Sequence, residues 1–209
     1  QHLFQSIIKY EKLEDKSVYC FFKAQSHSEE VKLFEDQTSF YFPRQLMDKG
    51  SQPNFSLADY ISPTGDDHIG LFAVTAGHGI ENIIKEYQAK NDDYSEIMAK
   101  VLADRLAEAA AEWLHKKVRT EYWGYSKDED LDLNAMLYEK YCGIRPAPGY
   151  PACPDHKEKD KIWKLLNVEE QIGINLTESR AMFPAASVCG WYFSHPKARY
   201  FSVLKNEIL

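Results

Sequence analysis

The segment GIRPAPGYPACPDH places one arginine ahead of four prolines. The guanidinium of Arg145 is planar and permanently charged, so it can hold a carboxylate with two parallel hydrogen bonds. Pro146 and Pro148 fix their φ angles and have no N–H, which leaves backbone donors in this stretch only at Ala147 and Gly149. Gly149 also lacks a Cβ and lets a ligand approach closely. The pattern predicts either a rigid loop that binds a small amino-acid-like ligand or a stiff crossover loop whose arginine makes an ordinary ion pair.

Carboxylates outside that loop are further candidates for a site. Asp59 lies among apolar neighbours in the stretch FSLADY, which is an unusual place for a charged side chain. Asp104 and Glu108 are one helical turn apart, so their carboxylates point the same way. The same spacing is typical of a solvated acidic face paired with Arg105 or Lys100. Both interpretations of this pair remain open at the level of the residues.

Motifs for other kinds of chemistry are absent from the sequence. The stretch AVTAGHGIENI lacks the third glycine of a dinucleotide fingerprint, and no Walker, His-Glu-x-x-His or Gly-x-Ser-x-Gly motif occurs. Cys153 and His156 make only half of a metal-binding set, and the other histidines are scattered. The sequence therefore offers no phosphate cradle, zincin site or hydrolase elbow, and we expect no metal site.

The elements that must position these residues differ along the chain. The centre contains a stretch without glycine or proline, residues 91–118, which predicts one long helix with an apolar stripe. We expect that stripe at Met98, Leu102, Leu106, Ala109 and Trp113. Shorter helices are expected at 133–141 and 156–168. Runs of β-branched and aromatic residues predict strands at 17–24, 31–35, 38–44, 68–77, 186–195 and 199–204.

This order of elements favours an α+β fold. Strands flank a helical centre instead of alternating with helices, so we expect a mixed or antiparallel twisted sheet with flanking helices, including one long central helix. A doubly wound Rossmann fold does not fit this order. With 209 residues and 44% hydrophobic residues, the chain is long enough for one domain with a substantial core.

Composition narrows the functional classes. A formal net charge of −7 and the lack of any basic cluster argue against nucleic-acid binding. The sequence has no run of 18 apolar residues and its beginning does not resemble a signal peptide, which predicts a cytoplasmic protein without membrane contact. The four cysteines are too sparse for a disulfide scaffold and are expected to be thiols.

Several motifs together resemble a known family. GIRPAPGYPACPDHKEK followed by LTESRAMFPAASVCGWYFSHPKARYF resembles the C-terminal activation (reactivation) domain of cobalamin-dependent methionine synthase. The resemblance also covers FSLADY, FAVTAG, KVLADRLAEAAAEWLH and YWGY, in that order, from Phe55 to about Val203. In that family the Arg-x-x-x-Gly-Tyr motif belongs to an S-adenosylmethionine site that lacks a Rossmann fold. In this sequence the motif corresponds to Arg145, Gly149 and Tyr150.

The resemblance implies a set of ligand-binding residues. It comprises Asp59, Glu108, Arg145, Ala147, Gly149, Tyr150, Tyr200 and Phe201. We expect Arg145 to hold the α-carboxylate of S-adenosylmethionine, Asp59 to hold its α-ammonium, and Glu108 to lie near the ammonium or the ribose. The backbone groups of Ala147 and Gly149 would meet the adenosine, and Tyr200 would close the pocket.

The implied function is the rescue of an oxidised cofactor. The domain would bind S-adenosylmethionine and present its methyl group for reductive methylation of inactive cob(II)alamin, which is carried by a partner domain. Flavodoxin or a similar flavoprotein would supply the electron and would need local basic residues such as Lys157, Lys159 or Lys161. The alternatives are a regulatory module that binds S-adenosylmethionine without methyl transfer, an ordinary methyltransferase, and a structural domain without a ligand.

Two features depart from the family pattern. Ala185-Ala186-Ser187 stands where the family usually shows Gly-Ala-Ser, which is a conservative difference. From the resemblance we also expect the chain to begin inside the family domain, without its opening helical segment, as either one domain of a longer protein or a shortened stand-alone relative would. We expect residues 1–209 to form a single S-adenosylmethionine-binding activation domain.

Overall fold

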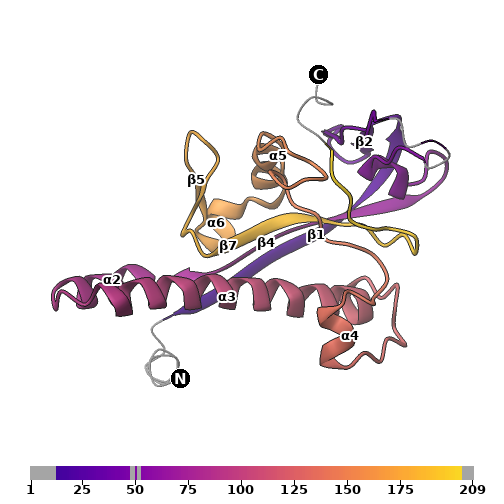
Figure 1. The fold of residues 1–209 in the computed structure, drawn as a ribbon. Coiled ribbons are helices and arrows are strands. Elements are labelled where there is room, and N and C mark those ends of the chain that lie inside the picture. The colour runs from indigo at the N-terminus through magenta and orange to yellow at the C-terminus, as the bar shows by residue number, and fades with distance from the viewer. Residues whose placement is uncertain (1–12, 48–49, 51–52, 204–209) are drawn as a thin grey trace.

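The structure is a computed structural model that describes residues 13–47, 50 and 53–203. Its centre is a five-stranded antiparallel sheet in the order β3-β2-β1-β4-β7. The strands span Glu14–His27 (β1), Glu30–Leu33 (β2), Ser39–Tyr41 (β3), Asp67–His78 (β4) and Ser187–Tyr192 (β7). The long strands β1 and β4 lie side by side, and the twisted sheet curls at the end that carries β2 (Figure 1). The predicted α+β class, with an antiparallel sheet and no Rossmann arrangement, is confirmed.

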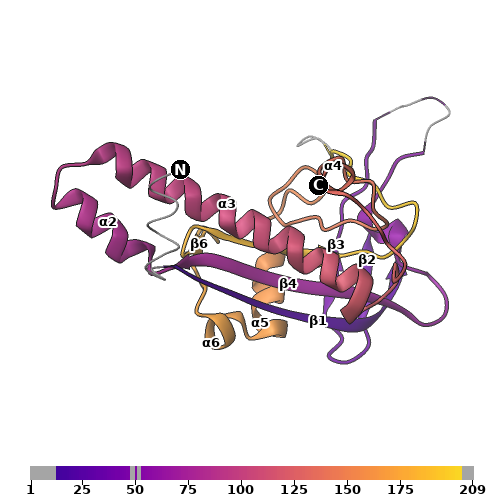
Figure 2. The same ribbon diagram turned by 90° about the horizontal axis from the view of Figure 1, so that it is seen from below.

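The helices cover both faces of the sheet. The long helix α3 lies across one face, and α5 and α6 lie against the other (Figures 1 and 2). No helix in the described ranges is long and apolar enough to cross a membrane. The elements besides the large sheet are a 3-10 turn at Leu57–Tyr60, α2 (Ile80–Gln88), α3 (Asp93–Lys117), a π-helical turn at Val118–Tyr122, α4 (Leu133–Leu137), α5 (Glu158–Leu166), α6 (Val168–Ile172), and a small two-stranded sheet of β5 (Asn175–Leu176) and β6 (Met182–Phe183).

The predicted long helix is present, but its buried stripe differs from the prediction. Small side chains face the sheet along most of the helix; the buried alanines are Ala99, Ala103, Ala107 and Ala111. The larger side chains of Leu114 and His115 are buried near its C-terminal end. An alanine in every turn lets the helix axis approach the strands closely, because no bulky side chain separates the two layers. Of the predicted stripe, Met98, Leu102 and Leu106 are only partly buried, while Ala109 and Trp113 are exposed.

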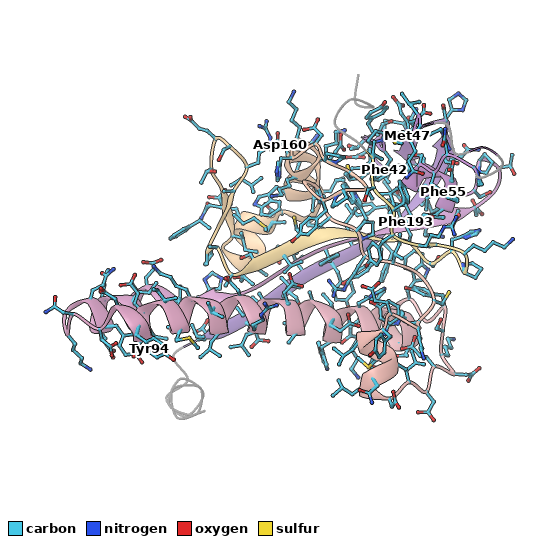
Figure 3. All side chains as sticks on the ribbon, in the orientation of Figure 1. Phe42, Met47, Phe55, Tyr94, Asp160 and Phe193 are labelled. Carbon is cyan, nitrogen blue, oxygen red and sulfur yellow. The ribbon has the colours of Figure 1, made fainter. Side chains whose placement is uncertain are left out.

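Aromatic rings fill the core on the other face. Trp191 of β7 is fully buried, and the ring of Phe42 lies 4.9 Å from it in an edge-to-face arrangement. Phe193 contacts Phe42 in the same way at 5.6 Å, and both side chains lie at the end of the sheet near β2 (Figure 3). This packing fixes the segment that follows β7, which carries the predicted residues Tyr200 and Phe201 toward the site.

Some predicted elements are shorter or absent. Residues 199–203 are not a strand, because the free edge of β7 is already paired with residues 144–146. The helix predicted at 133–141 is confined to α4, and the one predicted at 156–168 ends at Asn167, whose left-handed backbone (φ 48°) separates α5 from α6.

Candidate functional site

The proline loop is attached to the outer edge of β7. Ile144 and Phe193 exchange two backbone hydrogen bonds of 3.0 Å, and Trp191 N–H donates to the carbonyl of Pro146 at 3.0 Å. The prolines supply the carbonyl acceptor that the edge needs, and their missing N–H groups cost nothing there. Gly190 permits this approach, since a Cβ at that position would lie 2.2 Å from the Pro146 oxygen. The loop is therefore held as a short added strand.

Beyond Pro146 the loop folds on itself. The Gly149 N–H donates to Cys153 O at 2.8 Å, and the Tyr150 N–H donates to Ala147 O at 3.3 Å. Gly149 has φ 89°, and a Cβ there would lie 2.0 Å from the ring of His156. Gly149 is thus required by the loop, and its N–H is engaged within the loop. Within the part of the chain that the structure describes, the N–H of Ala147 makes no hydrogen bond.

A cavity of about 370 Å³ lies against this loop. Its volume is within the range of small-molecule sites. Six of the predicted site residues line it, from α3, the proline loop and the segment after β7: Glu108, Arg145, Ala147, Tyr150, Tyr200 and Phe201. The remaining lining residues are Glu139, Pro146, Pro151, Ala152, Val188 and Ser202.

Arg145 is the only cation among the residues that line this cavity in the described chain. Its Nη2 donates to Glu112 Oε2 at 3.0 Å, its Nη1 lies 3.9 Å from Glu108 Oε2, and its backbone N–H donates to the Tyr200 hydroxyl at 3.1 Å. Burial opposes the charge on Arg145, but the neighbouring Glu112 and Tyr200 outweigh burial and raise the pKa of Arg145 above its ordinary value. The guanidinium is therefore held and charged, with its Nη2 already engaged.

The segment after β7 forms the opposite wall. Val203 N–H donates to Pro151 O at 2.8 Å, and the side chain of Gln45 donates to Ser202 O at 2.6 Å. Phe201 packs against Phe55 with ring centroids 5.9 Å apart. These contacts hold the extended segment in place without a strand ladder. Burial raises the pKa of Tyr200, which keeps its hydroxyl protonated beside Arg145.

Asp59 does not line the cavity. Its two carboxylate oxygens accept hydrogen bonds from the Arg44 guanidinium at 2.7 and 2.6 Å, and one of them also accepts from the Ser56 N–H at 2.9 Å. Asp59 thus caps the 3-10 turn and forms an ion pair, although its neighbours in the sequence are apolar. The expected contact of Asp59 with a ligand ammonium has no support from this geometry.

Two carboxylates near Arg145 were not predicted from the sequence. Glu112 lies one turn beyond Glu108 on the same face of α3, and this spacing was a usable signal. Glu139 lines the cavity from a position with φ 51° after α4, and no pattern in the sequence marks it.

A second cavity of about 300 Å³ continues the first along α3. Glu108 and Val188 line both cavities. The second one is also bordered by Asp104 and Arg105 of the helix and by the Ala185-Ala186-Ser187 segment that departs from the family pattern. A ligand bound at Arg145 thus has space beside it, between α3 and the start of β7.

Comparison with known proteins shows the family of the chain. Residues 1–207 match the family described as vitamin B12 dependent methionine synthase, activation domain. The chain belongs to this family. It is similar to a crystal structure of the MetH reactivation domain bound to AdoHcy, with 43% sequence identity and a TM-score of 0.92. The match covers 97% of this chain and 67% of that one. The chain is therefore an activation domain of the kind found in cobalamin-dependent methionine synthase, a methyltransferase.

Proposed function

We propose that this domain binds S-adenosylmethionine in the cavity at Arg145 and presents its methyl group for the reductive methylation of cob(II)alamin. The observation that carries the proposal is the placement of Arg145, Glu108 and the Ala147 N–H around one cavity in a chain 43% identical to a reactivation domain solved with AdoHcy. The antiparallel sheet disfavours an ordinary Rossmann-type methyltransferase.

The charges of the cavity match those of the ligand. The cavity is lined by Arg145 and by two carboxylates, Glu108 and Glu139. S-adenosylmethionine carries an α-carboxylate, an α-ammonium and a sulfonium. In this proposal Arg145 holds the carboxylate and Glu108 the ammonium, while the Ala147 N–H donates to the adenosine. We expected Asp59 to hold the ammonium, and the proposal assigns this contact to Glu108 instead. The side chain of Glu108 is 48% exposed, and its Oε2 lies 3.9 Å from Nη1 of Arg145.

The domain contributes positioning and not acid–base chemistry. Cobalamin, carried by the partner domain, supplies the reduced cobalt that accepts the methyl group when it is bound. This displacement needs the acceptor, the methyl carbon and the sulfur in line, so the residues of this chain only have to hold the ligand with its methyl group exposed. The cavity beside Glu108 and Val188 is the space from which the methyl group would be reached.

The electron donor in this proposal is flavodoxin or a similar flavoprotein. Two of the three lysines that we expected near it are engaged within the domain. Lys159 is buried and donates to Arg180 O at 3.0 Å, and Lys161 is paired with Glu158 at 2.7 Å. Lys157 is exposed and is the most accessible of the three lysines for such a contact.

Two measurements test the proposal. Calorimetric titration of the chain with S-adenosylmethionine should show stoichiometric binding, and its absence would rule out both the reactivation function and the regulatory alternative. Addition of the cobalamin-carrying domain, cob(II)alamin and a reduced flavoprotein should then give methylcobalamin. Binding without methylcobalamin formation would favour the alternative, a regulatory module that senses S-adenosylmethionine.

A further inference from the structure

A row of alternating charges runs from the cavity into the protein. Behind Arg145 lies Glu112, which accepts a hydrogen bond from Nη2 of Arg145 at 3.0 Å. Glu112 Oε1 lies 3.8 Å from Nη1 of Arg119. Arg119 in turn donates two hydrogen bonds to Glu129, at 2.8 and 2.9 Å. The row joins α3 to the proline loop and to the segment between the π-helical turn and α4.

The far end of this row is buried. Arg119 has no exposed side-chain surface, and Glu129 is 6% exposed. The ring of Tyr141 lies against the guanidinium of Arg119, 3.9 Å from ring centroid to Cζ. A buried arginine with a two-pronged partner and a stacked ring is fixed in both plane and position. Arg119 is therefore a rigid support for whatever it contacts.

Local backbone structure brings the row together. Glu108, Glu112 and Arg119 lie on one face of α3 and its π-helical continuation, at spacings of one turn and two turns. Arg119 is the second residue of the π-helical turn in which the helix ends. Such turns are rare and concentrate at functional sites. Glu108 at the cavity, Glu112 behind it and the buried Arg119 thus all lie on one side of the helix.

We propose that Glu112 is a positioning residue for Arg145 and that Arg119, held by Glu129, acts through Glu112. This inference rests on the proposed function, because it assigns Arg145 to the carboxylate of S-adenosylmethionine. The hydrogen bond from Nη2 to Glu112 holds the guanidinium in place, which leaves its other N–H groups to meet the ligand carboxylate in a defined plane. Glu112 Oε1 and Arg119 Nη1 face each other at 3.8 Å and make no hydrogen bond among the described residues, so this contact is an ion pair only. The Nε of Arg145 is also buried without a hydrogen-bond partner there, so the guanidinium has a donor left over.

Glu112 also has an opposing effect. Its negative charge competes with the ligand carboxylate for Arg145, so its removal strengthens the field at the cavity. Loss of positioning is the larger effect in this proposal, because an unheld arginine side chain must be ordered when the ligand binds and its fork must be placed within a few tenths of an ångström. Positioning and charge competition can be separated experimentally, because glutamine at position 112 keeps the hydrogen-bond acceptor for Arg145 and removes the negative charge.

The first test compares Glu112→Ala with Glu112→Gln by calorimetry. The ligands are S-adenosylmethionine and decarboxylated S-adenosylmethionine, which lacks the α-carboxylate. We expect Glu112→Ala to weaken binding of the complete ligand about tenfold, which corresponds to the loss of one hydrogen bond. Glutamine should stay within about threefold of the wild type, and neither change should alter binding of the decarboxylated ligand. Glu121→Ala, which removes an exposed pair with Lys117, is the matched control and should change nothing.

The second test addresses the buried pair. Arg119→Met alone leaves Glu129 as an unpaired buried charge and can prevent folding. The double variant Arg119→Met/Glu129→Leu removes both charges, so its fold is expected to survive. It should bind S-adenosylmethionine about threefold to tenfold more weakly, with unchanged binding of the decarboxylated ligand.

The outcomes distinguish the two proposals. If the wild type does not bind S-adenosylmethionine, the proposed function fails. If it binds but Glu112→Ala binds equally well or more tightly, or if both ligands are weakened equally, the positioning role of Glu112 is wrong. If the double variant binds like the wild type, the role of Arg119 is wrong.

Discussion

At the scale of single residues, the site depends on how one arginine is shared. Arg145 donates from Nη2 to Glu112, its Nη1 lies 3.9 Å from Glu108, and it lines the cavity. The proposed ligand has a carboxylate that would lie against Arg145 and an ammonium that would lie against Glu108, so opposite charges alternate from Glu112 to the ligand. In our proposal this arrangement recognises the amino-acid part of the ligand by geometry as well as by charge, because the guanidinium is planar and held by Glu112.

The first prediction concerns Arg145 itself. Arg145→Lys keeps the charge and loses the planar fork, so affinity for S-adenosylmethionine should fall by about 1.5–3 kcal/mol, the range for hydrogen bonds to charged groups. The thermal stability should change little, because lysine can still pair with Glu112. The decarboxylated ligand should lose affinity relative to the complete one in the wild type, and much less in the variant. An equal loss in both proteins, measured by calorimetry, would show that Arg145 does not hold the carboxylate.

The second prediction concerns pH. Burial, together with the charges of Arg119 and Arg145, lowers the pKa of His115 well below 6.5. Below pH 6.5 the unfolded chain therefore binds a proton that the folded chain does not, so stability present above that pH is lost as the pH falls. His115→Gln should remove this contribution, which has a slope of up to about 1.4 kcal/mol per pH unit. Urea unfolding between pH 7 and 5 should show a shallower decline for the variant, and parallel curves would contradict the assignment.

At the scale of elements, the cavity is made by three pieces of chain that meet beside β7. The proline loop pairs with the edge of β7, α3 crosses the sheet on a stripe of alanines, and the segment after β7 returns over Pro151. Each piece is fixed by contacts outside the cavity. Loop and segment are therefore preformed, and little ordering remains for the ligand to induce.

The third prediction tests this rigidity. Replacing Pro146 and Pro148 together with alanine frees two φ angles, while alanine at 146 can still accept the hydrogen bond from Trp191. Affinity for S-adenosylmethionine should fall by at most about 1 kcal/mol per proline, and this loss should exceed the loss in unfolding free energy. Unchanged affinity with a large drop in melting temperature would favour a purely structural role for the prolines.

At the scale of the whole molecule, the domain carries one part of a larger reaction. The family to which it belongs is defined by cobalamin-dependent methionine synthase, and its solved relative extends beyond the matched part, since the match covers 67% of that chain. The extent of the domain, its electron donor and its cellular location remain predictions. In our proposal the second cavity along α3 is the space through which the partner domain would reach the ligand.

The fourth prediction concerns this division of labour. The chain should bind S-adenosylmethionine but not bind cobalamin tightly, because it lacks the Asp-x-His-x-x-Gly motif of the family's separate cobalamin module. Equilibrium dialysis against hydroxocobalamin, with and without S-adenosylmethionine, measures this directly. Stoichiometric cobalamin binding by this chain would contradict the proposed separation of roles.

Local chemistry was sufficient to predict much of this protein. The absence of glycine and proline over residues 91–118 predicted the long helix, and the proline loop with Arg145 marked the site. These features depend on the residues themselves and their nearest neighbours in the chain. Together with the family motifs, they predicted six residues that line the cavity.

Tertiary structure alone decided which groups are paired. Asp59 is taken by Arg44 and Arg145 by Glu112, and these partners lie 15 and 33 residues away in the sequence. The face of α3 that meets the sheet could not be predicted, because apolar side chains occur around much of the helix and close packing selected the alanines. Residues 199–203 have a strand-like pattern but no strand, because the proline loop already occupies the edge of β7. Competition for a partner or a sheet edge is a property of the whole fold, so no local pattern records its outcome.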